Sequence, residues 1–334
     1  MTSTDAPQAT RPPARASLPR HALRLRHKLA RDSGVLALPG SPAPAEPVSN
    51  RQLSGLPDAA QRYLRFMGVT GRPADWSFLA HCTGRFRLRP SWPWLPCEAW
   101  QYNSSLEVAR VFHLRIGGPV PMSARDAYAC GEGSVQGTML GLVHLVNGTG
   151  PEYDVSELVT YLNDAIFCAP GMLLNLPVTW TEAGEDCFDV TLRDAGHRVS
   201  ARVFLDERGA PVDFSTEDRW CDLPGGLARV RWTSPVEGCR QAGGRWLPTH
   251  GTAIWHLPGG DFSYAELRFR PGYLSYNVAP AELAGELSRG RSGEAARKVS
   301  GEARKATGEA ARKVTGDQAG GPAGASMDSQ ASAG

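Results

Sequence analysis

The middle of this 334-residue chain lacks lysine: residues 51–288 contain 21 arginines, no lysine and 26 acidic residues, a net charge of 21 − 26 = −5. The net charge of +2 on the whole chain therefore comes from its ends. Residues 1–50 carry 7 − 3 = +4, and residues 289–334 carry 8 − 5 = +3. A nucleic-acid reader normally has a basic patch on its folded part. This charge distribution argues against a nucleic-acid partner for the folded domain.

Motifs of catalysis and of cofactor binding are also missing. The sequence contains no G-x-S-x-G, no G-x-G-x-x-G, no Walker pattern and no C-x-x-C, and its scattered histidines favour structural roles over catalytic ones. The seven cysteines are odd in number and widely spaced, which is typical of free thiols in a reducing compartment. We therefore expect no cofactor and no metal, and the sequence leans against an enzyme.

Long apolar runs are absent as well. No segment reaches the roughly 18 apolar residues of a membrane span, and the first 50 residues lack the apolar core of a signal peptide. The default expectation is a soluble, cytoplasmic protein. The basic ends leave open a weak peripheral contact with a membrane surface.

Glycine and proline are plentiful, with 37 and 26 residues, which indicates many turns. Short alternating segments predict an antiparallel meander of about seven strands over residues 177–270. Its clearest unit is a hairpin in which residues 199–205 and 210–217 flank a polar loop that ends in Gly209. The other strands are expected at residues 179–181, 188–192, 227–232, 251–256 and 262–269.

A second group of about five strands is predicted before the meander. The first, at residues 76–89, is expected to bend at a bulge near Gly84. The others are expected at residues 97–102, 109–116, 124–130 and 134–146. This group should form one sheet with the meander.

Two helices are predicted from apolar periodicity. The first covers residues 57–67, with Gly68 after its end. The stronger one covers residues 154–167, with Asp154 and Glu157 as a variant of the capping box. Its apolar stripe must cover a face of the sheet.

Both ends differ in composition from this central part. Residues 1–52 are rich in proline and alanine and are predicted to be a disordered basic arm. A leucine-containing basic segment within the arm leaves a short amphipathic helix as an alternative. Residues 279–334 contain Ala/Gly/Glu/Lys/Arg repeats and are expected to be disordered or weakly helical.

Several motifs of the central part together suggest a family. They are Gly84-Arg85-Phe86-Arg87, Trp94-Leu95-Pro96, Glu98-Ala99-Trp100-Gln101-Tyr102, Arg125-Asp126-Ala127-Tyr128, Tyr161-Leu162, and the segment from Trp255 through Gly260-Asp261-Phe262. This pattern resembles an uncharacterised bacterial family catalogued as a domain of unknown function, over about residues 53–276. Members of that family often look membrane-attached by N-terminal helices, from which this chain departs. The order of elements is also similar to half-barrel lipid carriers of the bacterial envelope.

We therefore expect one α+β domain over residues 53–278. It should contain a strongly curved, half-barrel-like antiparallel sheet of about eleven strands, with one or two helices on its concave face.

The leading hypothesis for function is non-catalytic binding of an apolar or amphipathic, lipid-like small molecule between the sheet and the helix at residues 154–167. The predicted ligand-binding residues are Arg85, Glu98, Trp100, Tyr102, Arg125, Asp126, Leu158, Leu162, Ile166, Trp180 and Trp255. Arg85 or Arg125 is expected at the mouth, where it would meet an anionic head group. Two alternatives stay open. One is a hydrolase-type enzyme with its site at Arg85, Glu98, Tyr102, Arg125 and Asp126, and the other is a scaffold that acts through its tails.

Overall fold

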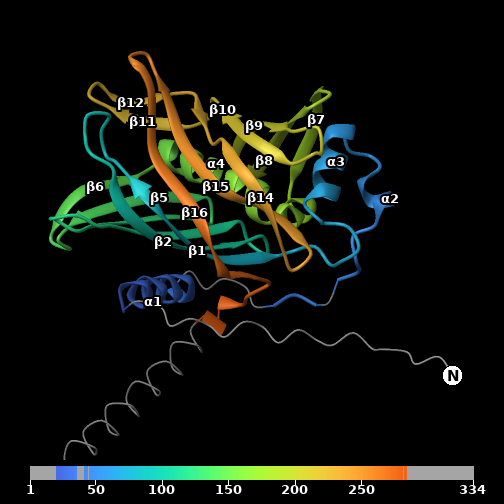
Figure 1. Cartoon of the computed structure of the whole chain (residues 1–334), viewed down its shortest axis with the longest axis horizontal. Coiled ribbons are helices and arrows are strands. Elements are labelled where there is room, and N and C mark those ends of the chain that lie inside the picture. Colours follow the sequence, from blue (N-terminus) through green and yellow to red (C-terminus); the bar gives the residue numbers. More distant parts are fainter. Residues whose placement is uncertain (1–19, 36–40, 44, 281, 284–334) are drawn as a thin grey trace, which may run out of the picture. The chain divides into compact units, whose positions relative to one another are not determined.

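The computed structural model describes residues 20–35, 41–43, 45–280 and 282–283, and one large antiparallel sheet dominates this part of the chain (Figure 1). The helices are α1 (Arg20–Val35), α2 (Asn50–Leu53), α3 (Asp58–Phe66), α4 (Pro151–Cys168) and a 3-10 helix, η1 (Pro170–Asn175). The strands are β1 (Ser77–Phe86), β2 (Leu95–Ser104), β3 (Ala109–Ile116), β4 (Met122–Ala129), β5 (Glu132–Met139), β6 (Val143–Thr149), β7 (Val178–Gly184), β8 (Cys187–Asp194), β9 (His197–Leu205), β10 (Pro211–Thr216), β11 (Trp220–Leu223), β12 (Gly226–Arg229), β13 (Trp232–Thr233), β14 (Val236–Ala242), β15 (Arg245–Leu257) and β16 (Gly260–Tyr276).

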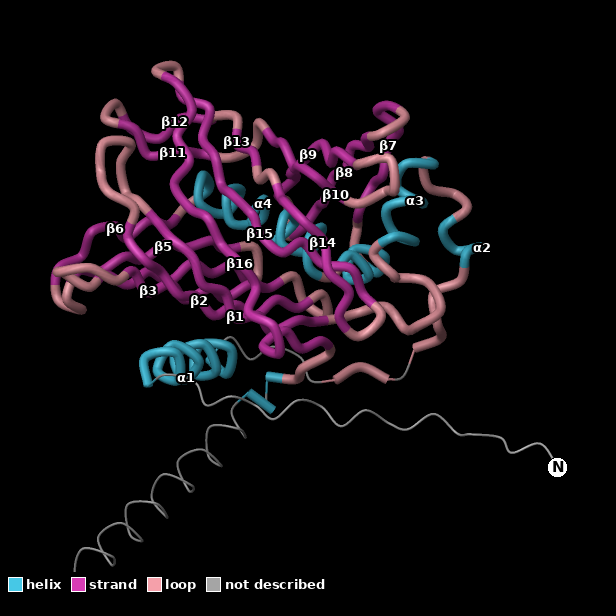
Figure 2. Tube along the Cα trace, in the orientation of Figure 1, coloured by secondary structure: helices cyan, strands magenta, loops and turns pink. Residues whose placement is uncertain are grey.

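The main sheet has 14 strands in the order β6-β5-β4-β3-β2-β1-β16-β15-β13-β10-β9-β8-β7, with β14 paired to β15. The last strand, β16, lies beside the first, β1, and so joins the two groups of strands into one surface. Figure 2 shows that this surface curls around α4. The predicted α+β fold with a strongly curved antiparallel sheet is confirmed.

Strand boundaries differ from the prediction in three places. Residues 134–146 form parts of two strands, β5 and β6, because Leu140 and Gly141 adopt positive φ and turn the chain. Residues 227–232 are likewise divided between β12 and β13. The bulge expected near Gly84 lies elsewhere: β1 and β2 pair continuously from Ser77 to Phe86, and the register between β1 and β16 shifts between Ala80 and Cys82. Gly84 is needed for another reason: a Cβ there would lie 1.8 Å from the Glu266 carbonyl oxygen of β16.

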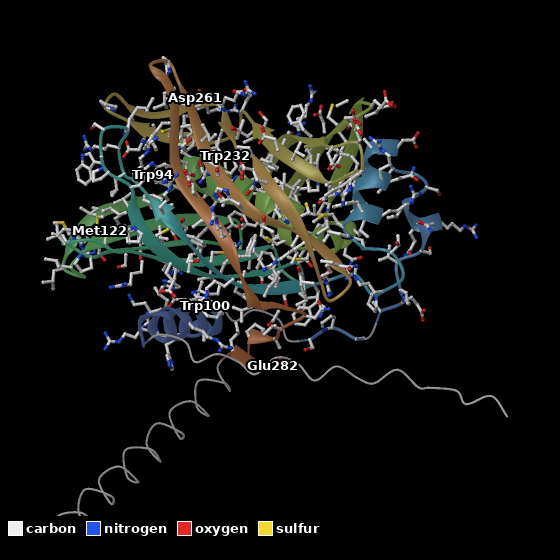
Figure 3. All side chains as sticks on the ribbon, in the orientation of Figure 1. Trp94, Trp100, Met122, Trp232, Asp261 and Glu282 are labelled. Atoms are coloured by element: carbon white, nitrogen blue, oxygen red, sulfur yellow. The ribbon has the colours of Figure 1, made fainter. Side chains whose placement is uncertain are left out.

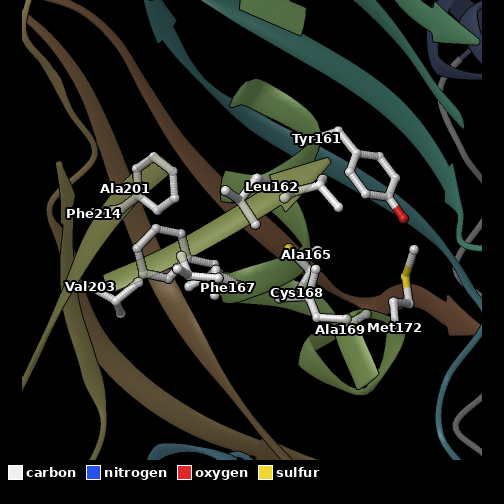
Figure 4. Close-up of a cluster of buried hydrophobic side chains, with 14 of the residues drawn as sticks. Tyr161, Leu162, Ala165, Phe167, Cys168, Ala169, Met172, Ala201, Val203 and Phe214 are labelled. Carbon is white, nitrogen blue, oxygen red and sulfur yellow. The ribbon is translucent and has the colours of Figure 1, made fainter. Parts of the chain in front are cut away.

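Helix α4 lies on the concave face of the sheet and forms the centre of the core. Leu158, Leu162 and Ile166 are fully buried, and Figure 4 shows Leu162 among Ala201 and Phe214 of β9 and β10. The predicted helix is therefore present, with its apolar stripe against the meander as the periodicity requires.

The start of α4 differs from the predicted capping box. The helix begins at Pro151 after Gly150, one turn earlier than expected. Asp154 Oδ1 instead accepts a hydrogen bond of 2.6 Å from the backbone N–H of Gly133 on β5. A Cβ at Gly133 would lie 2.3 Å from the Tyr153 carbonyl oxygen, so glycine permits this close contact between helix and strand.

Helix α1 lies on the opposite, outer face, where it contacts β2 and β3 (Figure 1). Leu25, Leu29 and Ala30 are buried there. Residues 20–35 thus form the short amphipathic helix that the sequence left as an alternative to a disordered arm, because the leucines of this basic segment bury an apolar stripe against the sheet. The predicted repeats from residue 289 onward lie outside the described residues.

Candidate functional site

A cavity of about 390 Å³ lies between the concave face of the sheet and one side of α4. Strand alternation sends every second side chain of β1 to β5 to the concave face, and some of these side chains line the cavity. Most of the lining is apolar, and its larger members are Phe86, Leu88, Phe112, Leu114, Ile116, Met122, Val135, Leu145, Val146, Phe167, Trp232, Val236, Trp255, Leu267 and Phe269. The volume falls in the range of small-molecule sites, which are commonly apolar with a few placed polar groups.

Those polar groups are centred on Arg110, which is 4% exposed on β3. Its Nε donates to Asp164 Oδ2 at 2.6 Å, and its Nη1 donates to Glu157 Oε2 at 3.0 Å. Gln101 Nε2 also donates to Asp164 Oδ2, at 2.5 Å. Because Glu157 and Asp164 belong to α4, this network ties the helix to β2 and β3.

Three further polar side chains line the cavity with hydrogen-bonding capacity to spare. Asn163 is 7% exposed, and its Nδ2 has no hydrogen-bond partner in the described part of the chain. Arg219 Nε is also buried without such a partner, while the guanidinium group lies 4.4 Å from the Trp232 ring centroid. The Asp126 carboxylate is partly exposed to the cavity, between the apolar rows of β3 and β5. Buried polar groups are normally paired, so Asn163 and Arg219 mark a place for a ligand or ordered water, beside the Asp126 carboxylate.

Burial changes the protonation of this cluster. It raises the pKa of Glu157 to about 8, with a further contribution from the negative charge of Asp126. Burial also raises the pKa of Asp126, against the attraction of Arg110 and Arg219. Burial likewise raises the pKa of Asp164, against the attraction of Arg110. Burial thus favours the uncharged forms of these three carboxyl groups, and the neighbouring guanidinium groups oppose it.

A second buried polar cluster lies on the outer face, beneath α1. His81 Nε2 lies 2.7 Å from Glu98 Oε1, and the His81 ring stacks on Trp100 with centroids 4.6 Å apart. Asp32 Oδ2 of α1 accepts from Arg125 Nε at 2.8 Å and lies 3.0 Å from His113 Nε2. Figure 3 shows Trp100 on the side of α1 and Trp232 on the other side of the sheet.

Of the predicted binding residues, the structure places Asp126 and Trp255 at the cavity. Arg85 is 54% exposed and forms an ion pair with Glu266 on the outer face, at 2.6 Å between Nε and Oε2. Tyr102 donates its hydroxyl hydrogen to the Val278 carbonyl oxygen at 2.9 Å. Glu98, Trp100 and Arg125 belong to the cluster beneath α1.

The single polar site proposed for a hydrolase is therefore wrong. Arg125 and Asp126 are adjacent in β4, so alternation sends their side chains to opposite faces of the sheet. Cross-strand pairing places Arg85, Glu98 and Tyr102 on the same face as Arg125.

The predicted apolar binding residues other than Trp255 also lie away from the cavity. Leu158, Leu162 and Ile166 face the core, because the cavity lies beside the neighbouring face of α4 that carries Glu157 and Asp164. Trp180 packs on Phe188 of β8, with ring centroids 5.4 Å apart. The predicted stripe thus holds the helix in place and does not line the cavity.

Sequence reasoning missed the polar end of the cavity: Arg110, Glu157, Asn163, Asp164 and Arg219. One signal was present in β3, where Arg110 shares its face with Phe112, Leu114 and Ile116. A single cation in an apolar row of a strand needs a buried partner. That partner, in α4, is not identifiable from local sequence because it lies 47 residues away.

The described residues contain no group of three or more His, Cys, Asp or Glu side chains that could hold a metal ion. Within the same residues, no helix is both long and apolar enough to cross a membrane.

Residues 46–267 match the model of a family of unknown function, DUF6544, and the chain belongs to this family. The expected membership of an uncharacterised family is thereby confirmed. No curated protein matches the sequence.

Similar solved structures include a domain from Vibrio parahaemolyticus described as an outer membrane lipoprotein-sorting protein, with 13% identity over 60% of this chain and 85% of that one, and a TM-score of 0.34. A LolA superfamily protein from Nitrosomonas europaea has 13% identity, coverage of 65% and 92%, and a TM-score of 0.34. A DUF1329 family protein from Desulfovibrio piger has 9% identity, coverage of 66% and 92%, and a TM-score of 0.37.

Proposed function

We propose that this protein binds an apolar or amphipathic small molecule, without catalysis, in the cavity between the concave face and α4. The observation that carries this proposal is the apolar cavity itself, about 390 Å³ in volume and closed at one end by polar groups. An apolar chain would displace water from the aromatic and aliphatic lining. Each buried CH₂ group would contribute about 0.8 kcal/mol.

The polar end favours an uncharged head group. Asp126 offers an acceptor and Asn163 Nδ2 offers a donor at the same cavity. A hydroxyl or amide group can both donate and accept, and it would therefore satisfy both side chains at once. The anionic head group expected to meet Arg85 or Arg125 lacks this support, because both arginines lie on the outer face.

A second candidate is an enzyme that uses Glu157 as a general acid or base. The observation that favours it is the raised pKa of Glu157, about 8, beside a second carboxylate at a cavity. This candidate requires turnover that the Glu157→Gln variant loses.

Mass spectrometry under native conditions, on protein purified from its own source, tests the binding proposal. A co-purifying compound with an apolar chain and an uncharged head group is the expected result. Its identity then supplies the probe for titration calorimetry; until then, a long-chain primary alcohol below its aggregation limit serves as the probe.

Ala253→Phe, which places a phenyl ring at the lining, should abolish saturable binding of that alcohol while the protein stays folded. Ala242→Phe, at an exposed position of β14, is the matched control and should bind as the wild type does. Equal binding by the two variants would contradict the proposed location.

A further inference from the structure

Large apolar side chains are exposed mainly at one end of strands β1 to β6. Six of the eight exposed large hydrophobic residues in the described part of the chain are Trp92, Val120, Leu140, Leu142, Val143 and Leu145, with exposed fractions from 42% to 81%. We call these six residues the apolar rim. Contiguous exposed apolar surface in a monomer usually marks a contact with a partner or a membrane.

Four rim residues lie in three turns that the topology brings together, and Val143 and Leu145 lie at the start of β6 directly after the third turn. The turns β1–β2, β3–β4 and β5–β6 all lie at the same end of consecutive antiparallel strands. Backbone hydrogen bonds join them, from Gly117 N–H to the Pro96 carbonyl at 2.7 Å and from Leu140 N–H to the Pro121 carbonyl at 2.9 Å. The rim is therefore a continuous feature of the fold.

The charge of these turns has one sign only. Residues 87–95, 117–121 and 138–146 contain two arginines, Arg87 and Arg89, one histidine and no acidic residue. This contrasts with the net negative charge of residues 51–288 as a whole. Apolar side chains flanked by cations, with a tryptophan among them, suit the interface of a bilayer that contains anionic lipids.

The rim is continuous with the cavity. Leu145 is 45% exposed and also lines the cavity. Val146 lines it beside Leu145, and Met122, at the start of β4 next to the same turns (Figure 3), lines it as well. The mouth of the cavity thus opens where the apolar side chains are exposed.

We propose that the apolar rim docks on an anionic lipid surface, with the mouth of the cavity facing the bilayer. Leu142 and its neighbours enter the outer part of the apolar layer, and Arg89 remains at the phosphate level. A molecule with an apolar chain can then pass between bilayer and cavity without exposing that chain to water. This proposal goes beyond ligand binding in the cavity, because it concerns a surface of the protein. Docking is measured with no added ligand, so it can fail or succeed independently of the proposed function.

Co-sedimentation of the full chain with vesicles of phosphatidylcholine and phosphatidylglycerol tests the docking. The wild type should sediment with these vesicles, more weakly with pure phosphatidylcholine and more weakly in high salt. Leu142→Asp should weaken binding at least about tenfold, since burying one leucine contributes on this scale.

Leu227→Asp is the matched control, because Leu227 is also an exposed leucine but lies in β12, outside the three turns and β6 that carry the rim. It introduces the same charge and leaves the basic ends of the chain unchanged, so it should bind as the wild type does. Arg89→Glu provides a second rim variant and should also weaken binding to the mixed vesicles. Thermal melts check that each variant is folded.

Three results would overturn the proposal: no binding of the wild type to the mixed vesicles, equal loss in Leu142→Asp and Leu227→Asp, or undiminished binding by both rim variants. Sedimentation velocity supplies a further test. If the wild type dimerises and Leu142→Asp is a monomer, a second copy of the chain covers the rim and the lipid proposal is wrong.

Discussion

The two faces of the sheet each bury a group of charged side chains, but the two groups differ in how their polar atoms are hydrogen-bonded. On the outer face, the Asp32 carboxylate of α1 meets both His113 and Arg125. On the concave face, Asn163 Nδ2 and Arg219 Nε lack partners in the described part of the chain and lie at a cavity. The comparison teaches that burial and charge do not by themselves mark a binding site. Unsatisfied polar groups beside an unfilled volume are the distinguishing feature.

The largest effect is expected from Arg110→Ala. This change removes the buried guanidinium group that donates hydrogen bonds to both Glu157 and Asp164, and it should lower the free energy of unfolding by about 3 to 5 kcal/mol. Urea denaturation measures the loss. Arg202→Ala, which breaks the exposed pair with Asp189, is the control and should cost at most about 1 kcal/mol. Similar small losses in both variants would mean that the concave cluster does not hold α4.

The two faces should also respond oppositely to pH. On the concave face, the folded-state pKa of Glu157 is about 8, against 4.5 as its ordinary value. Between these values the folded protein holds more protons than the unfolded one. The stability that Glu157 contributes is therefore complete below pH 4.5 and is lost as the pH rises through about 8.

Glu157→Gln should remove this trend. We expect the difference in unfolding free energy between wild type and variant to change by roughly 2 to 4 kcal/mol over this range, at about 1.4 kcal/mol per unit of pKa. Urea titrations from pH 5 to about pH 9 measure it. A difference independent of pH would show that Glu157 is ionised in the folded protein across this range.

A smaller effect of opposite sign is expected on the outer face. Burial acts to raise the pKa of Asp32, but hydrogen bonds from His113 and Arg125 outweigh it and leave the pKa below its ordinary value of 3.8. The stability from Asp32 is present above pH 3.8 and is lost as the pH falls below it.

Asp32→Asn should therefore destabilise the protein by about 1 to 3 kcal/mol at neutral pH, the scale of a hydrogen bond to a charged group. Urea denaturation at pH 7 measures this loss, and hydrogen exchange should show faster opening of α1. Binding of the long-chain alcohol should be unchanged, because Asp32 lies on the face away from the cavity. Loss of alcohol binding in this variant would contradict the claim that the outer cluster and the cavity act independently.

More of the fold than of the site could be predicted from the sequence. Alternation and turn residues identified most strands, and apolar periodicity identified α4, because both patterns are local in sequence. The end of α4 at Cys168 agrees with the breaker Pro170-Gly171. The role of α1 was missed because its short leucine stripe is stable only against the sheet, which local composition does not reveal.

The site could be predicted only in part, since its geometry depends on pairing between distant segments. Asp126 follows Arg125 directly in β4, so alternation sends the two side chains to opposite faces, yet both were assigned to one site. Alternation alone does not say which face of a sheet a helix covers. The apolar stripe of α4 was likewise correct, but the cavity lies beside the adjoining polar face.

Quenching of tryptophan fluorescence by a brominated long-chain alcohol tests the central claim most directly, because tryptophans lie on both faces. Trp232 and Trp255 line the cavity, whereas Trp100 and Trp180 do not. We predict saturable quenching of the wild type that is largely lost in the double variant Trp232→Phe/Trp255→Phe and retained in Trp100→Phe/Trp180→Phe. Loss of quenching in the second variant with retention in the first would contradict the account, as would the absence of saturable quenching in the wild type.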